Sequence, residues 1–216
     1  MNCKIFKYDG SRKVCYLILP MEIGDDAMKE LTIAYKMNLV EVFNIDWDNV
    51  LTPWPEKNVF PGEEDFKGEA PDFLKFLQER VIPDIEKKLA IDGAIRRQLL
   101  GISLSGLFAV WAWTQCDTFI DIASISGSFW FDGFPEWLAT KGKVTKPGFI
   151  YLSLGDQEGK TKVKRFQPVE KATAEVAMTL REDGAQVVYE TTPGPHHAPM
   201  IPRIRLALDR LSRQDD

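Results

Sequence analysis

Residues 99–107 form the segment Leu99-Leu100-Gly101-Ile102-Ser103-Leu104-Ser105-Gly106-Leu107, which is the strongest indication of the fold in this sequence. An apolar run typical of a buried strand stops at a serine between small residues and then continues with helical spacing. A strand that turns into a helix so quickly holds the serine in strained backbone geometry, so the positions two before and two after it must be small. Gly101 and Ser105 meet this requirement around Ser103. Centring the turn on Ser105 would put the branched Leu107 at the second small position, which makes Ser103 the better candidate.

The turn departs from the Gly-x-Ser-x-Gly pattern at one position, where Ser105 stands in place of a glycine. Small residues at a strand-to-helix junction can also serve close packing alone, and a degenerate pattern of this kind occurs by chance in many chains. Ser103 is therefore a candidate nucleophile that needs support from other parts of the sequence.

Size and composition predict a globular chain with one substantial core. With 216 residues, 44% apolar and 27% charged, we expect a single domain over residues 1–216. The net charge of −5 argues against nucleic acid or an anionic membrane as a partner, because both need a basic surface. The oligomeric state stays open from sequence, a homodimer included.

Residues 1–9 contain no apolar core of the length that a signal peptide needs, and no later run reaches the length of a membrane span. We therefore expect the protein in the cytoplasm. Cys3, Cys15 and Cys116 lack paired spacing, which favours reduced thiols over disulfides. With only two histidines in the chain, we expect no metal site.

Apolar runs rich in β-branched and aromatic residues alternate with segments of helical spacing. The expected strands are Val14 to Leu19, Leu39 to Ile45, Gln98 to Ile102, Ile120 to Ile125, Phe149 to Leu154 and Gln186 to Thr191. The expected helices are Asp25 to Tyr35, Pro71 to Leu89, Gly106 to Gln115, Pro135 to Ala139, Pro168 to Arg181 and Ile204 to Leu211. This alternation predicts an α/β fold with a mainly parallel sheet, helices on both faces, and binding residues at the carboxyl ends of the strands.

Two segments have further features. In the long helix, we expect one apolar stripe to pack on the sheet, formed by Leu74, Leu77, Val81, Ile85 and Leu89. Pro83 is expected to end or kink this helix. Residues 52–70 form a long stretch with prolines, glycines, Trp54, Phe60 and Phe66. Loops of this length usually carry function or disorder. The aromatic content favours an ordered loop that forms the rim of a pocket.

A serine hydroxyl needs a base, and the base needs an acceptor that orients it. His196 and His197 are the only histidines, in a loop that follows the last expected strand, where α/β-hydrolases carry their base. We expect one of the two to accept the proton of Ser103. For the acid, Asp156 and Glu158 both follow the strand Phe149 to Leu154, and these residues alone do not decide between them.

The same geometry predicts an oxyanion hole. The helix that begins after Ser103 directs backbone N–H groups toward a developing negative charge, first of all that of Leu104. A second donor should come from the loop after the strand Val14 to Leu19, where Met21 is the best candidate.

Five stretches, in this order along the chain, carry a family resemblance. They are Trp47-Asp48-Asn49-Val50-Leu51-Thr52-Pro53-Trp54, Gly101-Ile102-Ser103-Leu104-Ser105-Gly106-Leu107-Phe108-Ala109, Ala123-Ser124-Ile125-Ser126-Gly127-Ser128-Phe129-Trp130, Ser153-Leu154-Gly155-Asp156-Gln157-Glu158 and Gly194-Pro195-His196-His197. From about Leu39 to Leu211 the chain resembles the putative esterase family of α/β-hydrolases, which includes enterochelin (siderophore) esterases and feruloyl esterases. The resemblance implies the α/β-hydrolase fold, close to its minimal core and without a large lid.

The resemblance also implies roles for single residues. The nucleophile of the family's Gly-x-Ser-x-Gly-Gly element corresponds to Ser103. The base of its Gly-Asn-His-Phe element corresponds to His196, so that His197 stands where an aromatic residue is usual. The Gly-x-x-Asp/Glu element ends at Glu158, which favours Glu158 over Asp156 as the acid. Without a lid, Trp54, Trp130 and Phe131 would shape a shallow aromatic pocket for the substrate.

Taken together, the sequence predicts a serine carboxylesterase with the triad Ser103, His196 and Glu158, a small-molecule ester as substrate and no cofactor. Two alternatives use the same scaffold. One is an acyltransferase or thioesterase with the same triad. The other is a non-catalytic binding protein, because a fold alone does not guarantee chemistry.

Overall fold

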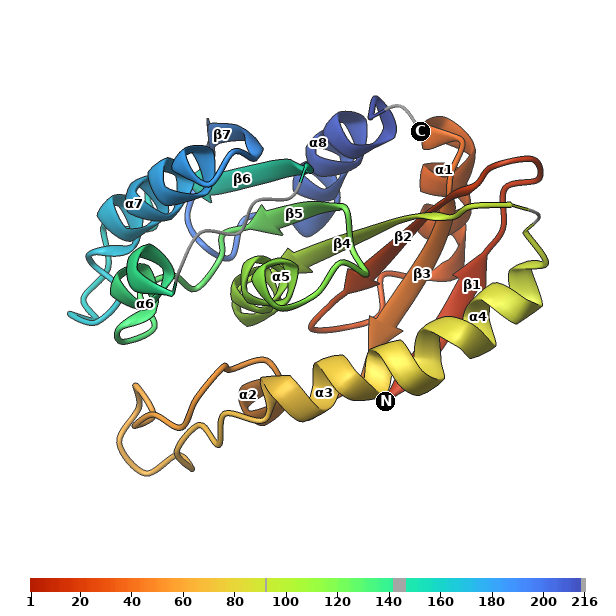
Figure 1. The fold of residues 1–216 in the computed structure, drawn as a ribbon. Coiled ribbons are helices and arrows are strands. Elements are labelled where there is room, and N and C mark those ends of the chain that lie inside the picture. The colour runs from red at the N-terminus through yellow and green to blue at the C-terminus, as the bar shows by residue number, and fades with distance from the viewer. Residues whose placement is uncertain (92, 142–146, 215–216) are drawn as a thin grey trace.

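The centre of the molecule is a seven-stranded sheet with the strand order β1-β3-β2-β4-β5-β6-β7. We analysed a computed structural model, which describes residues 1–91, 93–141 and 147–214. Strand β1 pairs antiparallel with β3, and the other neighbouring strands of the sheet are parallel (Figure 1). The prediction of an α/β fold with a mostly parallel sheet is confirmed.

Strands and helices alternate along most of the chain. The strands are β1 (Asn2–Phe6), β2 (Lys13–Ile18), β3 (Asn38–Phe43), β4 (Arg96–Ile102), β5 (Asp121–Ile125), β6 (Phe149–Gly155) and β7 (Gln186–Thr192). The helices are α1 (Asp25–Tyr35), α2 (Trp47–Val50), α3 (Ala70–Phe76), the π-helical turn η1 (Leu77–Val81), α4 (Ile82–Leu89), α5 (Leu104–Gln115), α6 (Phe134–Thr140), α7 (Val169–Glu182) and α8 (Met200–Ser212).

The sheet is covered on both faces, which gives the molecule two apolar cores. Successive residues of β2 point to opposite faces, as strand geometry requires. Val14, Tyr16 and Ile18 belong to the larger core, to which α3, α4, α5 and α7 contribute. Cys15 and Leu17 belong to the smaller core, together with side chains of α1 and α8. Figure 1 shows α1 and α8 on one side of the sheet and the rod of α3 and α4 on the other.

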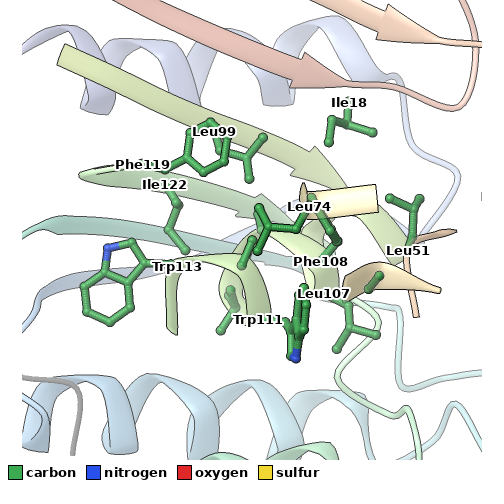
Figure 2. Close-up of a cluster of buried hydrophobic side chains, with 14 of the residues drawn as sticks. Ile18, Leu51, Leu74, Leu99, Leu107, Phe108, Trp111, Trp113, Phe119 and Ile122 are labelled. Carbon is green, nitrogen blue, oxygen red and sulfur yellow. The ribbon is translucent and has the colours of Figure 1, made fainter. Parts of the chain in front are cut away.

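Helix α5 runs through the larger core, and its residues 104–113 are all buried. Leu107, Phe108, Trp111 and Trp113 pack with residues of the strands and of α3 (Figure 2). A helix that is apolar on every side needs such burial. The burial of α5 fixes the position of the Ser103 turn that precedes it.

Among the residues that the structure describes, no helix has the length and apolar character to cross a membrane.

The predicted strands all occur, with ends that differ by a few residues, but one strand was missed. Strand β1 alternates between polar and apolar residues at the edge of the sheet, and Asn2, Cys3 and Lys4 are not buried. An edge strand of five residues with one covered side gives only a weak apolar signal.

The long helix predicted from Pro71 to Leu89 exists, but it is not a regular α-helix. A π-helical turn, Leu77–Val81, joins α3 to α4, and Pro83 lies in the first turn of α4. Proline has no N–H to donate, and a π turn is one way in which a helix continues around such a gap. The predicted stripe from Leu74 to Leu89 is buried against the sheet, as expected.

Candidate active site

The turn between β4 and α5 gives Ser103 an unusual backbone conformation. Ser103 has φ 61° and ψ −121°, which is strained for a residue with a side chain. Its N–H donates to the Ile125 carbonyl at 3.0 Å, and its own carbonyl accepts from the Gly106 N–H at 3.0 Å. A Cβ at Gly101 would lie 2.0 Å from the Ser105 carbonyl oxygen, so glycine is required there. This is the geometry that a nucleophile elbow needs.

Ser105, the departure from the glycine pattern, has a structural function in this turn. Its side chain is buried, and its hydroxyl accepts a hydrogen bond from the Ile102 N–H at 2.7 Å. The hydroxyl hydrogen can go to the carbonyl of Ile18 at 2.7 Å or to that of Ile102 at 2.9 Å. Ser105 therefore connects the start of α5 to the ends of both β4 and β2.

The structure brings His196 to Ser103 across 93 residues of sequence. His196 Nε2 lies 3.1 Å from Ser103 Oγ, and its Nδ1 lies 2.7 Å from Glu158 Oε2. With the proton on Nδ1, the imidazole donates to Glu158 and accepts from the Ser103 hydroxyl. The three side chains come from loops after β4, β6 and β7, whose carboxyl ends meet at one edge of the sheet.

Glu158 is held in place from several sides. Its side chain is only 3% exposed, and its Oε1 accepts from the Gly155 N–H at 2.7 Å and from the Ser126 hydroxyl. Burial raises the pKa of Glu158, but the hydrogen bonds from His196, Ser126 and Gly155 outweigh it and leave the pKa below its usual value. Glu158 is therefore a carboxylate at neutral pH.

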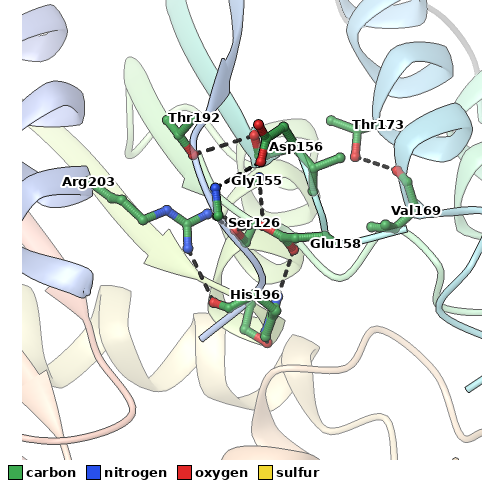
Figure 3. A network of polar contacts seen from close by, with 12 residues as sticks. Ser126, Gly155, Asp156, Glu158, Val169, Thr173, Thr192, His196 and Arg203 are labelled. Carbon is green, nitrogen blue, oxygen red and sulfur yellow. Dashed lines mark hydrogen bonds and ion pairs between the residues drawn. The ribbon is translucent and has the colours of Figure 1, made fainter. Parts of the chain in front are cut away.

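Arg203 and Ser126 complete this buried network, and sequence reasoning missed both (Figure 3). Arg203 Nη2 lies 3.1 Å from Glu158 Oε1 and also donates to the Ser126 hydroxyl, while Nη1 donates to the His196 carbonyl at 3.2 Å. One signal was present in the sequence. Arg203 lies four residues before Ala207 and eight before Leu211, on the apolar face of the last helix.

Asp156 and His197, the alternatives considered for acid and base, lie differently. Asp156 Oδ1 accepts from the Gly194 N–H at 2.8 Å, so it supports the histidine loop from its start. His197 is exposed, and its ring meets that of His196 edge-on with centroids 5.2 Å apart. The structure therefore favours Glu158 and His196 as the pair next to Ser103.

The two candidate oxyanion donors differ in their relation to Ser103. Leu104 begins α5, directly after Ser103. Met21 lies in the loop after β2 and lines a cavity together with Ser103 and His196. That loop is fixed on both sides, by the bond from Ser105 to the Ile18 carbonyl and by the Ile23 N–H, which donates to the buried Glu41 at 2.6 Å.

In the described part of the chain, Ser103 lines three cavities, and His196 also lines the two described next. The first, which we call the Trp130 cavity, has a volume of about 510 Å³. Its lining includes Phe60, Trp130, Lys160, Val163, Phe166 and Val169. The second, the Met21 cavity, has a volume of about 470 Å³ and is lined by residues that include Pro20, Met21, Trp47, Pro199 and Met200. Both are mainly apolar, and both are large enough for part of a small ligand.

The three aromatic residues expected at the substrate differ in position. Trp130 lines the Trp130 cavity, where its ring packs on Phe166 at 4.5 Å between centroids. Phe131 is fully buried, and Trp54 packs behind it with centroids 5.9 Å apart. The expectation of substrate contact does not fit Phe131, because the turn of residues 127–131 directs its ring into the core. Nor does it fit Trp54, whose indole N–H donates to the Asp132 carbonyl at 3.2 Å and which is not among the residues that line the cavity. Trp130 faces the cavity, whereas Phe129 and Phe131 enter the core.

The loop of residues 52–70 contributes Phe60 rather than Trp54 to the cavity. Arg165 holds this rim together, since it donates to the Lys57 carbonyl and to Asp132 Oδ1, the latter at 3.0 Å. Its guanidinium also lies 5.7 Å from the Trp130 ring centroid, within the range of a cation–π contact. The rim is thus ordered by contacts between loops.

Comparison with known proteins assigns the chain to a family. The family described as Putative esterase matches residues 24–198. The chain belongs to this family. Among curated proteins, it is 31% identical over 135 residues to the uncharacterized protein YbbA of Bacillus subtilis. That match covers 62% of this chain and 54% of the length of YbbA.

Solved structures of serine and siderophore hydrolases share the fold. An IroE-like serine hydrolase from Shewanella oneidensis aligns with a TM-score of 0.79 and 18% identity, over 99% of this chain and 76% of its own. The siderophore hydrolase EstA from Aspergillus nidulans aligns with a TM-score of 0.68 and 18% identity, over 97% and 88% of the two chains. At such identities the likeness establishes the fold, which is that of the α/β-hydrolases.

Proposed function

We propose that this chain is a serine carboxylesterase that works by acyl transfer. One observation carries the proposal: Ser103 Oγ, His196 and the buried Glu158 carboxylate form a continuous hydrogen-bonded line that faces two apolar cavities. Membership of an esterase family supports the same reaction class.

In the proposed reaction, Ser103 Oγ attacks the ester carbonyl carbon while His196 Nε2 takes the hydroxyl proton. Glu158 keeps the proton on Nδ1 and stabilises the imidazolium that forms. The N–H groups of Leu104 and Met21 would stabilise the oxyanion. His196 then gives its proton to the departing alcohol, and a water molecule, activated by the same histidine, releases the carboxylic acid from Ser103.

The cavities favour a particular kind of ester. Ser103 and His196 line both the Trp130 cavity and the Met21 cavity, and we expect the acyl and alcohol parts of the ester to occupy one each. Aromatic walls such as Trp130 and Phe166 favour a flat or branched apolar group over a charged one. We therefore expect aryl esters to be better substrates than short alkyl esters.

The proposal is tested by the hydrolysis of a panel of p-nitrophenyl, phenyl and ethyl esters with the wild type, S103A and H196A. We expect hydrolysis by the wild type alone, with an initial burst of alcohol where release of the acyl group is slow. Equal hydrolysis by S103A would contradict the proposal. Product analysis with added alcohols separates an esterase from an acyltransferase, because a transferase yields the new ester in preference to the acid.

A further inference from the structure

Arg203 is a charged residue buried inside the proposed machinery, although a serine, a histidine and an acid are sufficient for the chemistry. Its side chain is 5% exposed, and that of its partner Glu158 is 3% exposed. Burial of a charge on this scale is costly unless the charge is paired and hydrogen-bonded. Such a position therefore calls for a function.

The contacts of Arg203 divide the Glu158 carboxylate between two partners. Arg203 Nη2 donates to Glu158 Oε1 at 3.1 Å, which leaves Oε2 for His196 Nδ1 at 2.7 Å. Nη1 donates to the carbonyl of His196 itself at 3.2 Å. One guanidinium thus fixes the acid through its side chain and the base through its backbone.

We propose that Arg203 is a positioning residue that clamps Glu158 and His196 in register and offsets part of the negative charge that Glu158 presents to the protonated histidine. The proposal rests on the function proposed above. Because the positive charge lies against Oε1, it weakens the attraction between the carboxylate and an imidazolium at Oε2. The clamp keeps the geometry for proton transfer, and the offset reduces the electrostatic stabilisation that a proton on the imidazole gains from Glu158.

Other titratable groups also face this pair. His197 contacts the His196 ring, and Lys160 lines the Trp130 cavity with it. Tyr189 from β7 faces Glu158, and Tyr151 from β6 faces Arg203. Burial raises the pKa of both tyrosines, to about 12 for Tyr151, so both are neutral in the range of interest. Asp156 is bonded to the Gly194 N–H. The ion pair with Glu158 Oε1 comes from Arg203 and not from any of the other groups named in this paragraph.

The test is the pH dependence of phosphonylation by a fluorophosphonate probe between pH 5 and 10, with the full chain. R203M removes the charge and the clamp but keeps the volume of the side chain. R203K keeps the charge without the fork of donors. R205M is the matched control, since Arg205 lies on the same helix but pairs with Glu30 at the surface. Thermal unfolding at each pH verifies that the variants are folded.

For R203M we expect the midpoint of the rate profile to move up by about one pH unit, and the plateau rate to fall by about tenfold or more. R203K should keep the wild-type midpoint within about 0.3 unit and lose rate by a similar factor. R205M should match the wild type in both. Removal of Arg203 leaves Glu158 with its bonds from Gly155, Ser126 and His196, so we expect R203M to fold.

The outcomes separate this proposal from the one it rests on. A folded wild type that does not react with the probe contradicts the proposed function and with it this inference. A reactive wild type with R203M unchanged in midpoint and rate overturns the inference alone. If R203M does not fold, R203K decides: a lower rate at an unchanged midpoint supports the proposal, and a wild-type rate or a shifted midpoint overturns it.

Discussion

The two sides of the candidate site are held together by different forces. Behind His196, the Glu158 side chain is almost fully buried and is fixed by hydrogen bonds and an ion pair with set geometry. Around the Trp130 cavity, the rim consists of loop residues in aromatic contact, and Phe60 is 53% exposed. A buried polar network has one good arrangement, whereas apolar contacts tolerate many. The first side should therefore determine the rate and the second the choice of substrate.

The largest effect is expected from removal of the proposed nucleophile or base. S103A and H196A should each lower kcat/KM for an aryl ester by about 10⁴-fold or more, because the three residues act as a unit. H197A is the matched control, since His197 is exposed and bonds to neither Ser103 nor Glu158 in the described structure. It should stay within about threefold of the wild type. A comparable loss in H197A would reverse the assignment of the base.

The next largest effect on the rate is expected from the loss of the proposed acid, Glu158. E158Q should lower kcat by about 10³-fold or more, because a neutral amide neither stabilises the imidazolium nor fixes its tautomer. The same change leaves the buried Arg203 without its counter-ion, so the free energy of unfolding should fall by about 3 kcal/mol. Steady-state kinetics and denaturant unfolding measure the two effects.

A double variant separates rate from stability on this buried side. E158Q/R203M should recover much of the lost stability while it stays inactive, because it removes the unpaired charge but does not restore the carboxylate. D156N is the control for the acid and should retain most of the rate. If D156N lost as much rate as E158Q, Asp156 would be the acid instead.

A smaller effect is expected at Ser105, which joins the turn after β4 to the end of β2. S105A removes the hydroxyl that joins Ile102 to Ile18, at a cost of about 1–2 kcal/mol in stability. Because the Ile18 carbonyl leads into the Met21 loop, kcat should also fall by about tenfold while KM changes little. Denaturant unfolding and steady-state kinetics test this, and an unchanged kcat in a destabilised S105A would limit Ser105 to packing.

The smallest effect on rate belongs to the rim. W130A and F60A should raise KM for aryl esters by about fivefold to tenfold and leave kcat within about threefold, since they remove apolar contacts but no reacting group. F76A serves as the control, because Phe76 is an equally exposed phenylalanine on α3, outside the residues that line the cavity. A large fall of kcat in W130A would show that rim and machinery are not separable.

The fold and part of the candidate site could be predicted from the sequence. The fold was predictable because alternating apolar runs and one strand-to-helix turn have strong local signals, as Ser103 and its neighbours demonstrate. The pair His196 and His197 was accessible because histidines are scarce in this chain, and family resemblance favoured His196. Glu158 could be separated from Asp156 only by family resemblance, since both lie in one acidic turn, and the hydrogen bonds that distinguish them come from distant segments.

The rest of the site depends on contacts between segments far apart in sequence. Arg203 meets Glu158 across 45 residues and Ser126 across 77, and neither pairing leaves a local pattern. The rings expected at the substrate were assigned by type alone, so the sequence could not distinguish Trp130, at the cavity, from Phe131, in the core. Side-chain direction after the sharp turn at Gly127 decides this.

The proposed function requires Ser103 to be an activated nucleophile. The intact mass of the folded protein after exposure to a fluorophosphonate probe tests this, with S103A treated in parallel. We expect a single adduct on the wild type and none on S103A. An unmodified wild type, or an adduct that persists on S103A, would contradict the proposed function.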